Sequence, residues 1–280
     1  MDATIKKQLE ITALKVRMGI IEGTFNAKSG HPGGSLSISD VLTYLYCVKM
    51  NVNPADPDMP ERDRLVLSKG HCAPALYSVL SEKGFFPKEE LKSLRHIGAM
   101  LQGHPCIKIP GVDMSSGSLG QGISVACGMA LAGKTDNADY KVYTILGDGE
   151  LEEGEVWEAA MFAAHNKLDN LVAIVDNNGL QIDGSINDVC SPEPIDEKFA
   201  AFGWHVIKTP AHDFDELEKA FDEAEKISSK PVVIIQKSVK GSGVSFMENM
   251  CSWHGKAPDK EQYDKAMSEL SQRIEELESK

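Results

Sequence analysis

The sequence predicts an α/β fold, in which a doubly wound, mostly parallel sheet has helices on both faces. Short runs of mostly apolar residues alternate, almost throughout the chain, with longer segments whose apolar residues recur at helical spacing. Within the short runs, apolar and polar residues do not strictly alternate. This pattern is typical of strands covered on both faces, as in parallel sheets. The chain has 280 residues, 42% of them hydrophobic, which is ample for a packed core.

The N-terminal half is predicted to be largely helical. A helix over residues 3–26 carries apolar side chains at helical spacing. The glycine-rich segment 29–37 should end it, and Ser37 or Ser39 should then cap a second helix over residues 41–48. The elements expected next are a Pro/Asp-rich loop at 51–63, a strand at 64–68, a helix at 75–80, a helix that starts at Pro87 and a loop at 101–105.

The C-terminal half is predicted to alternate strands with helices. A glycine- and serine-rich loop at 113–122 leads into an Ala/Gly-rich helix at 123–132, whose small side chains suit close packing against another helix or another chain. The other strands are expected at 142–146, 171–175, 204–208 and 232–236, and the other helices at 154–167, 195–201, 214–227 and 259–280. The helix at 154–167 should present one face formed by Val156, Trp157, Ala160, Met161 and Ala164. We assign residues 1–258 to one domain and 259–280 to a C-terminal helix that packs on that domain or on a partner.

Net charge, apolar content and cysteine spacing indicate which kinds of partner and which cellular location to expect. The net charge of −13 argues against nucleic acid and anionic membranes as partners. The N-terminus has no apolar signal core, and no run of about 18 apolar residues occurs. The six cysteines form no CxxC pair and no zinc-like spacing, so we expect a reducing, cytoplasmic location.

The most informative stretch joins two predicted strands. The turn Gly147-Asp148-Gly149 follows the strand at 142–146, and Asn177-Asn178-Gly179 follows the strand at 171–175. In a right-handed βαβ unit both strands run the same way, so both loops lie at the carboxyl edge of the sheet. We therefore expect Asp148 and Asn178 to meet in space. A carboxylate, an amide oxygen and a nearby backbone carbonyl would suit Mg²⁺ or Ca²⁺ and leave positions free for phosphate oxygens.

Four of the eight histidines lie in glycine-bearing loops. A single loop histidine is more often a surface group than a catalyst, but four in such settings indicate a shared polar pocket. Histidine titrates near neutral pH and is therefore a natural proton carrier. The four are His31 in SGHPGG, His71 in SKGH, His104 in QGHP and His254 in WHGK. The others, which we expect to be structural, are His96, His165, His205 and His212.

One segment matches a nucleotide-binding motif letter for letter. Residues 128–135 fit the P-loop pattern GxxxxGK[ST]. A P-loop needs a strand before it and a helix after it. Here a predicted helix precedes the segment and a loop into a strand follows, so we expect Lys134 to lie at a helix C-terminus, where a cation is favoured.

Together these segments resemble the transketolase family. GDG followed after 27 residues by NN resembles the binding motif for thiamine diphosphate (TPP). The segments SGHPGG, RLVLSKGH, QGHP, SSGSLGQG, GDGELEEG, DNNGLQIDG and WHG each match a family segment in order and spacing, from about residue 9 to about residue 258. The resemblance implies a TPP-binding fold of the diphosphate-binding type, with Mg²⁺ or Ca²⁺ as the second cofactor.

The resemblance also implies roles for individual residues. The metal would be held by Asp148, Asn178 and the carbonyl of Leu180. The cofactor-binding residues would be His71, Gly117, Ser118, Leu119, Gly147, Asp148, Gly149, Glu153, Asn178, Leu180 and His254. The catalytic residues would be His31, His71, His104, His254, Glu153 and Glu158, the two glutamates facing the partner active site across an interface. Full-length members usually carry proline where this chain has Ser118.

The chain lacks part of what the family's reaction needs. Transketolases move a two-carbon ketol unit from a ketose phosphate to an aldose phosphate, and a glutamate of a second, pyrimidine-binding domain activates the cofactor. After residue 258 only one charged helix remains, and we take the initial Met and this amphipathic helix as natural ends. We therefore expect the N-terminal subunit of a split transketolase, which is inactive without its C-terminal subunit. It should also self-associate, to form a heterotetramer that acts on sugar phosphates.

Three alternatives remain open at this point. The α subunit of a 2-oxo acid dehydrogenase shares the GDG and NN pair, although the SGHPGG and SKGH loops favour transketolase. A non-catalytic TPP-binding module would keep the motif without the chemistry, although retention of all four loop histidines argues against it. A P-loop ATPase is the third alternative, and nucleotide hydrolysis would reveal it.

Overall fold

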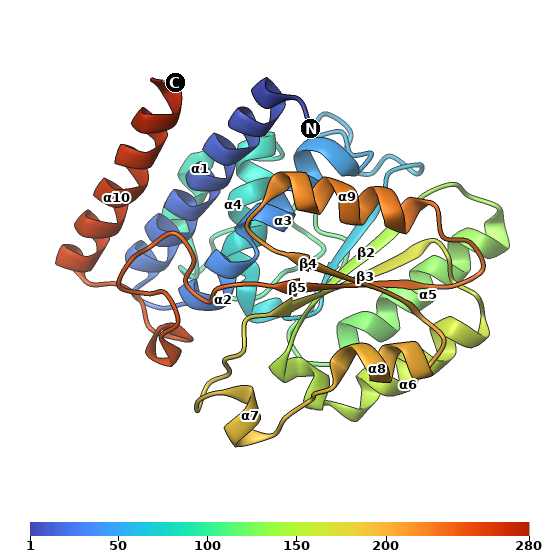
Figure 1. Cartoon of the computed structure of the whole chain (residues 1–280). Coiled ribbons are helices and arrows are strands. Elements are labelled where there is room, and N and C mark those ends of the chain that lie inside the picture. The colour runs from blue at the N-terminus through green and yellow to red at the C-terminus, as the bar shows by residue number, and fades with distance from the viewer. Residues whose placement is uncertain (280) are drawn as a thin grey trace.

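Five parallel strands form the centre of the protein. A computed structural model describes residues 1–279. The strands lie in the order β1-β2-β3-β5-β4, and every neighbouring pair is parallel (Figure 1). Their bounds are β1 Arg64–Leu67, β2 Val142–Gly147, β3 Leu171–Asn177, β4 His205–Pro210 and β5 Val232–Lys237. The predicted doubly wound α/β class is therefore confirmed.

Helices cover both faces of this sheet (Figure 1). One face is covered by a helical layer made of α1 Ala3–Ala27, α2 Pro32–Ser37, α3 Ser39–Tyr44, α4 Ala73–Lys83 and α9 Phe214–Glu225, and α10 Lys260–Glu278 packs on the outside of α1. The other face is covered by α5 Gln121–Asp136, α6 Gly154–His165 and α8 Ile195–Ala201. The short helix α7 Ile186–Val189 lies in the loop after β3. Figure 1 shows it below the sheet, away from the larger helical layer.

The strand sequences explain why two layers form. A row of register partners crosses the sheet and belongs to the core under α1, α3 and α9; it consists of Leu67, Ile145, Ile174, Ile234 and Ile207. The adjacent positions Val142 and Leu146 belong to the core under α5 and α6. Because successive side chains point to opposite faces, each strand contributes apolar surface to both layers.

The glycine-rich segment 29–37 interrupts the helical structure over fewer residues than predicted. Helix α2 already begins at Pro32, and the two glycines that follow are helical. A Cβ on Gly33 would lie 2.9 Å from the carbonyl oxygen of Trp253, so this glycine permits a close helix contact. The predicted N-caps are also wrong, because Ile38 is the N-cap of α3, while the Ser37 hydroxyl donates to Asp176 and the Ser39 hydroxyl donates to the Ser35 carbonyl oxygen.

Helices α5 and α6, on the other face of the sheet, test two further predictions. In α6 the side chain of Met161 is 58% exposed, whereas Ala159 and Ala163 are buried, so the predicted apolar face was wrong at Met161. Residues 128–135 lie wholly inside α5, which rules out a P-loop there. Near the end of that helix Lys134 Nζ donates to the Lys167 carbonyl oxygen at 2.9 Å.

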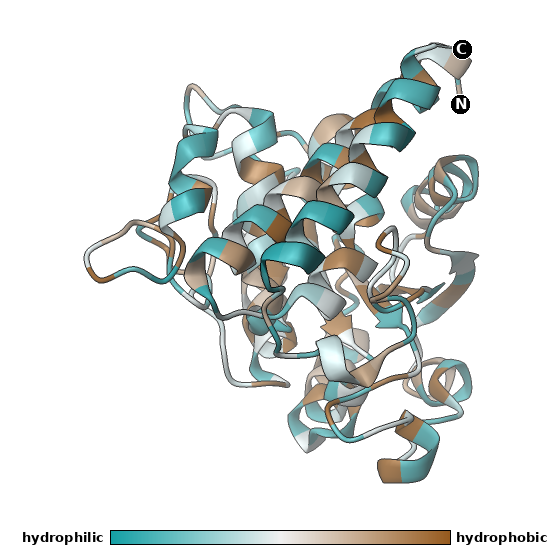
Figure 2. Ribbon diagram, turned by 90° about the vertical axis from the view of Figure 1, so that its left-hand side faces the viewer, coloured by the Kyte–Doolittle hydropathy of each residue, from teal (hydrophilic) through white to brown (hydrophobic). Residues whose placement is uncertain are grey.

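The C-terminal helix α10 lies against α1. Asp259 and Gln262 form a capping box at its start. Leu270 is buried in the core, and Tyr263 stacks on Phe25 with ring centroids 4.3 Å apart. Figure 2 shows mostly hydrophilic residues along this helix, interrupted by hydrophobic ones. Among residues 1–279 no helix combines the length and apolar character needed to cross a bilayer.

Candidate active site

A pocket of about 410 Å³ opens at the carboxyl edge of β1, β2 and β3. Loops after these three strands form most of its wall, together with the loop before α5, the start of α2 and the segment that follows β5. The predicted site residues that line it are His31, His71, Gly117, Leu119, Gly147, Asp148, Gly149, Glu153, Asn178, Leu180 and His254. The parallel topology thus brings together loops that are up to about 220 residues apart in the chain.

The two predicted oxygen-bearing side chains do meet in this pocket. Asp148 Oδ1 accepts from the Gly149 N–H at 2.8 Å, and its Oδ2 accepts from the Gly179 N–H at 2.5 Å. Asn178 Oδ1 accepts from the Leu180 N–H at 3.1 Å. The loops after β2 and β3 are therefore joined by direct hydrogen bonds.

The donor set suits a hard divalent cation. Asp148 is 2% exposed, and burial, followed by the nearby charge of Asp176, raises its pKa to about 6. A buried carboxylate without a cation is unfavourable, and amide and carbonyl oxygens beside it are typical Mg²⁺ or Ca²⁺ ligands. Among residues 1–279 no group of three or more His, Cys, Asp or Glu could hold a metal, but this set contains only one such side chain.

Three of the four predicted histidines form a cluster. The ring centroids of His31, His71 and His254 lie 5.1 to 5.4 Å from one another. Burial is the main cause that lowers the pKa of each, to about 4 for His31, about 4 for His71 and about 3 for His254. Cationic neighbours add to the effect on His71 and His254. All three are therefore neutral at pH 7 and can accept a hydrogen bond.

The remaining predicted residues lie at or beyond the rim. His104 is exposed at the mouth, with its ring near Gly117, and its carbonyl oxygen accepts from Tyr77. Ser118 is exposed in the same region, and Glu158 is exposed on α6; neither lines the pocket.

Glu150 is a functional candidate that the sequence analysis missed. This buried carboxylate accepts from the Gly120 N–H at 2.9 Å, the Gly147 N–H at 3.0 Å and the Ser68 hydroxyl. It therefore fixes the relative positions of the loops after β1 and β2 and the start of α5. Its place directly after the GDG turn was the available signal.

Lys240 is a second missed candidate. It is 2% exposed, and its Nζ lies 2.9 Å from the Leu180 carbonyl oxygen and 3.1 Å from His254 Nδ1. Burial, followed by the charge of Lys69, lowers its pKa. An ammonium group inside a pocket favours an anionic ligand. The only sequence signal was a lysine next to glycine after a strand.

Other cavities lack this combination of groups. One of about 480 Å³ lies between α1, α9 and α10 and is lined by the Arg17–Asp40 ion pair and His212. Another, of about 340 Å³, lies at the ends of β4 and β5. Neither contains the GDG turn or the histidine cluster. We therefore take the pocket at the carboxyl edge of β1, β2 and β3 as the candidate active site.

Comparison with known proteins identifies the family of the chain. Residues 9–274 match the family described as transketolase, thiamine diphosphate binding domain. The chain is 45% identical to a subunit of the apulose-4-phosphate transketolase of Phocaeicola vulgatus over 270 residues, which is 96% of each chain. It is 47% identical to the 6-deoxy-6-sulfo-D-fructose transketolase subunit SqwG of a Clostridium species over 242 residues, 86% of this chain and 88% of that one.

Longer transketolases match over part of their length. The transketolase structure from Campylobacter jejuni superposes with a TM-score of 0.90 at 34% identity, over 97% of this chain and 43% of that one. The chain thus spans less than half of this longer protein. With a family match that covers nearly all of its residues, the chain belongs to the transketolase family and represents its N-terminal, thiamine diphosphate-binding part.

Proposed function

We propose that this chain is the diphosphate-binding subunit of a split transketolase. With a partner that carries the pyrimidine-binding domain, it transfers a two-carbon ketol unit from a ketose phosphate to an aldose phosphate. The observation that carries the proposal is the similarity along 96% of its length to the Phocaeicola vulgatus transketolase subunit, which has nearly the same extent. The partner is a C-terminal transketolase subunit, without which the chain is inactive.

Asp148, Asn178 and the Leu180 carbonyl hold Mg²⁺ or Ca²⁺ in this proposal, and the metal binds the cofactor's diphosphate. The convergence of these groups across two loops supports the assignment. Lys240 contributes a positive charge beside the same carbonyl. When bound, thiamine diphosphate supplies an electron sink for cleavage of a carbon–carbon bond next to a carbonyl.

The histidines bind the sugar and move protons. His31, His71 and His254 are neutral and clustered, so they can accept hydrogen bonds from donor hydroxyls, and a negative charge that develops beside them would favour their proton uptake. His104, at the mouth, is placed to contact a sugar that enters the pocket. Gly117, Ser118 and Leu119 flank the cofactor near the same opening.

Helices α5 and α6 form the surface through which two copies associate. Exposed apolar side chains lie on them: Val125, Met161 and Phe162. Glu153 lines the pocket, and Glu158 lies on the exposed side of α6. We propose that both glutamates face the second copy, and that two copies with two partners form a heterotetramer. A cytoplasmic location follows from the cysteine usage.

The division of the chain is also a proposal. We assign residues 1–258 to the diphosphate-binding domain and residues 259–280 to a C-terminal segment, whose helix α10 Lys260–Glu278 packs on that domain. The burial of Leu270 and the Phe25–Tyr263 stack against α1 support this division.

Calorimetric titration of TPP into the purified chain tests the proposal, with Mg²⁺, with Ca²⁺ and with EDTA, before and after addition of the candidate C-terminal subunit. We expect binding only with metal, tighter binding with the partner, and ketol transfer only with both chains. Absence of TPP binding under every condition would overturn the cofactor assignment. Decarboxylation of 2-oxo acids, or TPP binding without activity with any partner, would favour the two TPP-binding alternatives.

A further inference from the structure

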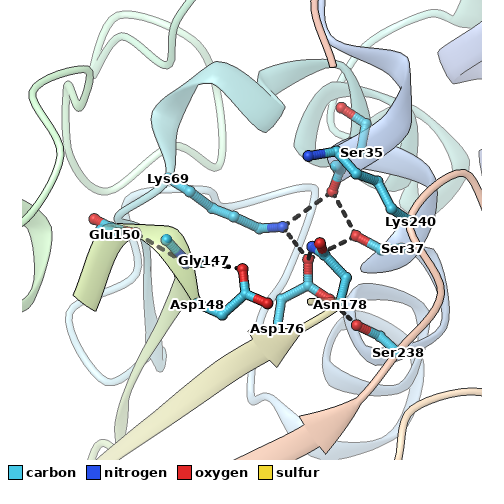
Figure 3. Close-up of polar contacts among 12 residues, drawn as sticks. Ser35, Ser37, Lys69, Gly147, Asp148, Glu150, Asp176, Asn178, Ser238 and Lys240 are labelled. Atoms are coloured by element: carbon cyan, nitrogen blue, oxygen red, sulfur yellow. Dashed lines mark hydrogen bonds and ion pairs between the residues drawn. The ribbon is translucent and has the colours of Figure 1, made fainter. Parts of the chain in front are cut away.

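A buried carboxylate lies directly behind the proposed metal ligands. Asp176, near the end of β3, is completely buried and accepts four hydrogen bonds (Figure 3). Its Oδ2 accepts from Ser37 Oγ at 2.6 Å, from Lys69 Nζ and from Asn178 Nδ2 at 2.9 Å. Its Oδ1 accepts from Ser238 Oγ. The donors come from α2, from the residues after β1, from the residues after β3 and from the residue after β5.

The Asp176 oxygen that contacts Asn178 is saturated with donors of the chain. Each oxygen of an ionised carboxylate offers about two lone pairs, and Oδ2 already accepts from three donors, whereas Oδ1 accepts from one. One of the donors to Oδ2 is the Lys69 ammonium group, which also donates to the Gly34 carbonyl oxygen at 3.0 Å. With Oδ2 occupied in this way, Asp176 influences the pocket through its partners.

The partner that matters is Asn178. A carboxylate only accepts hydrogen bonds, so the amide nitrogen of Asn178 must be the group that faces Asp176. The oxygen of that amide then points away from Asp176 and accepts from the Leu180 N–H at 3.1 Å, and Asn178 lines the same pocket as Asp148. With the amide turned over, an NH₂ group would take the place of the oxygen and could not bind a cation.

We propose that Asp176, paired with Lys69, is a positioning residue that holds the amide oxygen of Asn178 toward the metal. This inference rests on the proposed metal and cofactor site. It assigns to Asp176 a contribution to metal affinity, although Asp176 contacts neither the metal nor the cofactor. Hydrogen-bond partners of metal ligands typically contribute 10–100-fold to metal affinity.

The first variant is Asp176→Asn. Asparagine at 176 both donates and accepts, so it no longer dictates the orientation of Asn178. We measure Mn²⁺ binding in the presence of saturating TPP by electron paramagnetic resonance, which requires no turnover. D176N should weaken Mn²⁺ affinity by about 10–100-fold.

A rescue variant separates positioning from a purely structural role. In D176N/N178D the carboxylate is moved to position 178, where its two oxygens are equivalent and need no orientation, while the formal charge is unchanged. This double variant should recover most of the Mn²⁺ affinity. The control is Ser238→Ala, which removes a donor to the other oxygen of Asp176 and should bind Mn²⁺ almost as wild type does.

D176N leaves the Lys69 ammonium buried without its partner, which can destabilise the fold. The variant K69M/D176N removes both charges, and thermal unfolding without metal shows whether each variant is folded. A folded D176N or K69M/D176N protein with wild-type Mn²⁺ affinity would overturn the inference. A folded D176N/N178D protein whose Mn²⁺ affinity is no higher than that of D176N would also overturn the inference. Failure of the wild-type protein to bind Mn²⁺ with TPP would instead overturn the proposed function.

Discussion

At the scale of single residues, the pocket combines two buried carboxylates, Asp148 and Glu150, with three neutral imidazoles and two buried lysines. Asp148 has a raised pKa because it is buried, and the clustered histidines have lowered pKa values for the same reason. Burial disfavours the charged form in both cases. A divalent cation would stabilise the charged form of Asp148, whereas the histidines remain neutral and available as hydrogen-bond acceptors.

Asp148→Ala tests the metal site. Removal of the only carboxylate among the three proposed ligands should weaken metal-dependent TPP binding at least about 100-fold, because a single buried charge partner of the cation is lost. Calorimetric titration with Mg²⁺ and with EDTA measures the effect. Wild-type TPP affinity in D148A would refute the ligand assignment.

His71→Gln tests the electrostatics of the cluster. The pKa of His71 is lowered from 6.5 to about 4 by burial and then by Lys69, so between these values the unfolded chain binds a proton that the folded chain does not. The contribution of neutral His71 to the free energy of unfolding is therefore fully present above pH 6.5. It is lost as the pH falls toward 4. By linkage the loss at pH 5 is about 2 kcal/mol.

Urea unfolding of the metal-free protein at pH 7.5 and pH 5 measures this change. The H71Q protein should lose about 2 kcal/mol less than wild type between the two pH values. Parallel pH profiles would mean that His71 takes up a proton equally well in the folded and unfolded states.

At the scale of elements, close approach of backbones determines where helices begin. Helix α5 packs its first turn against the end of β1, and a Cβ on Gly122 would lie 2.5 Å from the Cα of Ser68. Gly128, in the same helix, is exposed and has no atom within 4 Å of such a Cβ. Position 122 therefore has no room for a side chain, whereas position 128 has room for one.

Gly122→Ala should destabilise the protein by about 1–3 kcal/mol, because main-chain atoms must move to admit the methyl group. Gly128→Ala is the matched control and should be neutral or stabilise by up to about 1 kcal/mol, because alanine is the better helix former. Denaturant unfolding of both proteins measures the difference. Equal stability of the two variants would contradict the close contact between α5 and β1.

At the scale of the whole molecule, the pocket opens at one edge of the sheet, and the proposed association surface lies on α5 and α6. In the proposed function, a C-terminal subunit and a second copy of this chain complete the pocket. This is why the self-association and the partner belong to the same proposal.

Met161→Asp should weaken self-association without loss of fold, because a charge replaces a side chain that is 58% exposed in the single chain. Sedimentation velocity should show a shift toward the monomer. Ile97→Asp is the control, since Ile97 is fully exposed but belongs to neither α5 nor α6. Identical sedimentation of wild-type and M161D proteins would place the interface elsewhere.

The sequence by itself determined the fold class and the meeting of Asp148 with Asn178. Both depend on local order along the chain, because a βαβ unit of about 30 residues must place its two loops at one edge of the sheet. The positions of most strands followed in the same way from continuous apolar runs. The membership of His31, His71 and His254 in one pocket was predicted from their small-residue loops.

Only the tertiary structure decided which groups support that pocket. Asp176 is held by Ser37 and Lys69, which are 139 and 107 positions away in the chain. Lys240 reaches a carbonyl 60 positions away. No local pattern encodes such contacts, because they depend on how separate elements pack. For the same reason Gly33 looked like a helix breaker in the sequence, whereas in the structure it lies inside a helix packed closely against the main chain of Trp253.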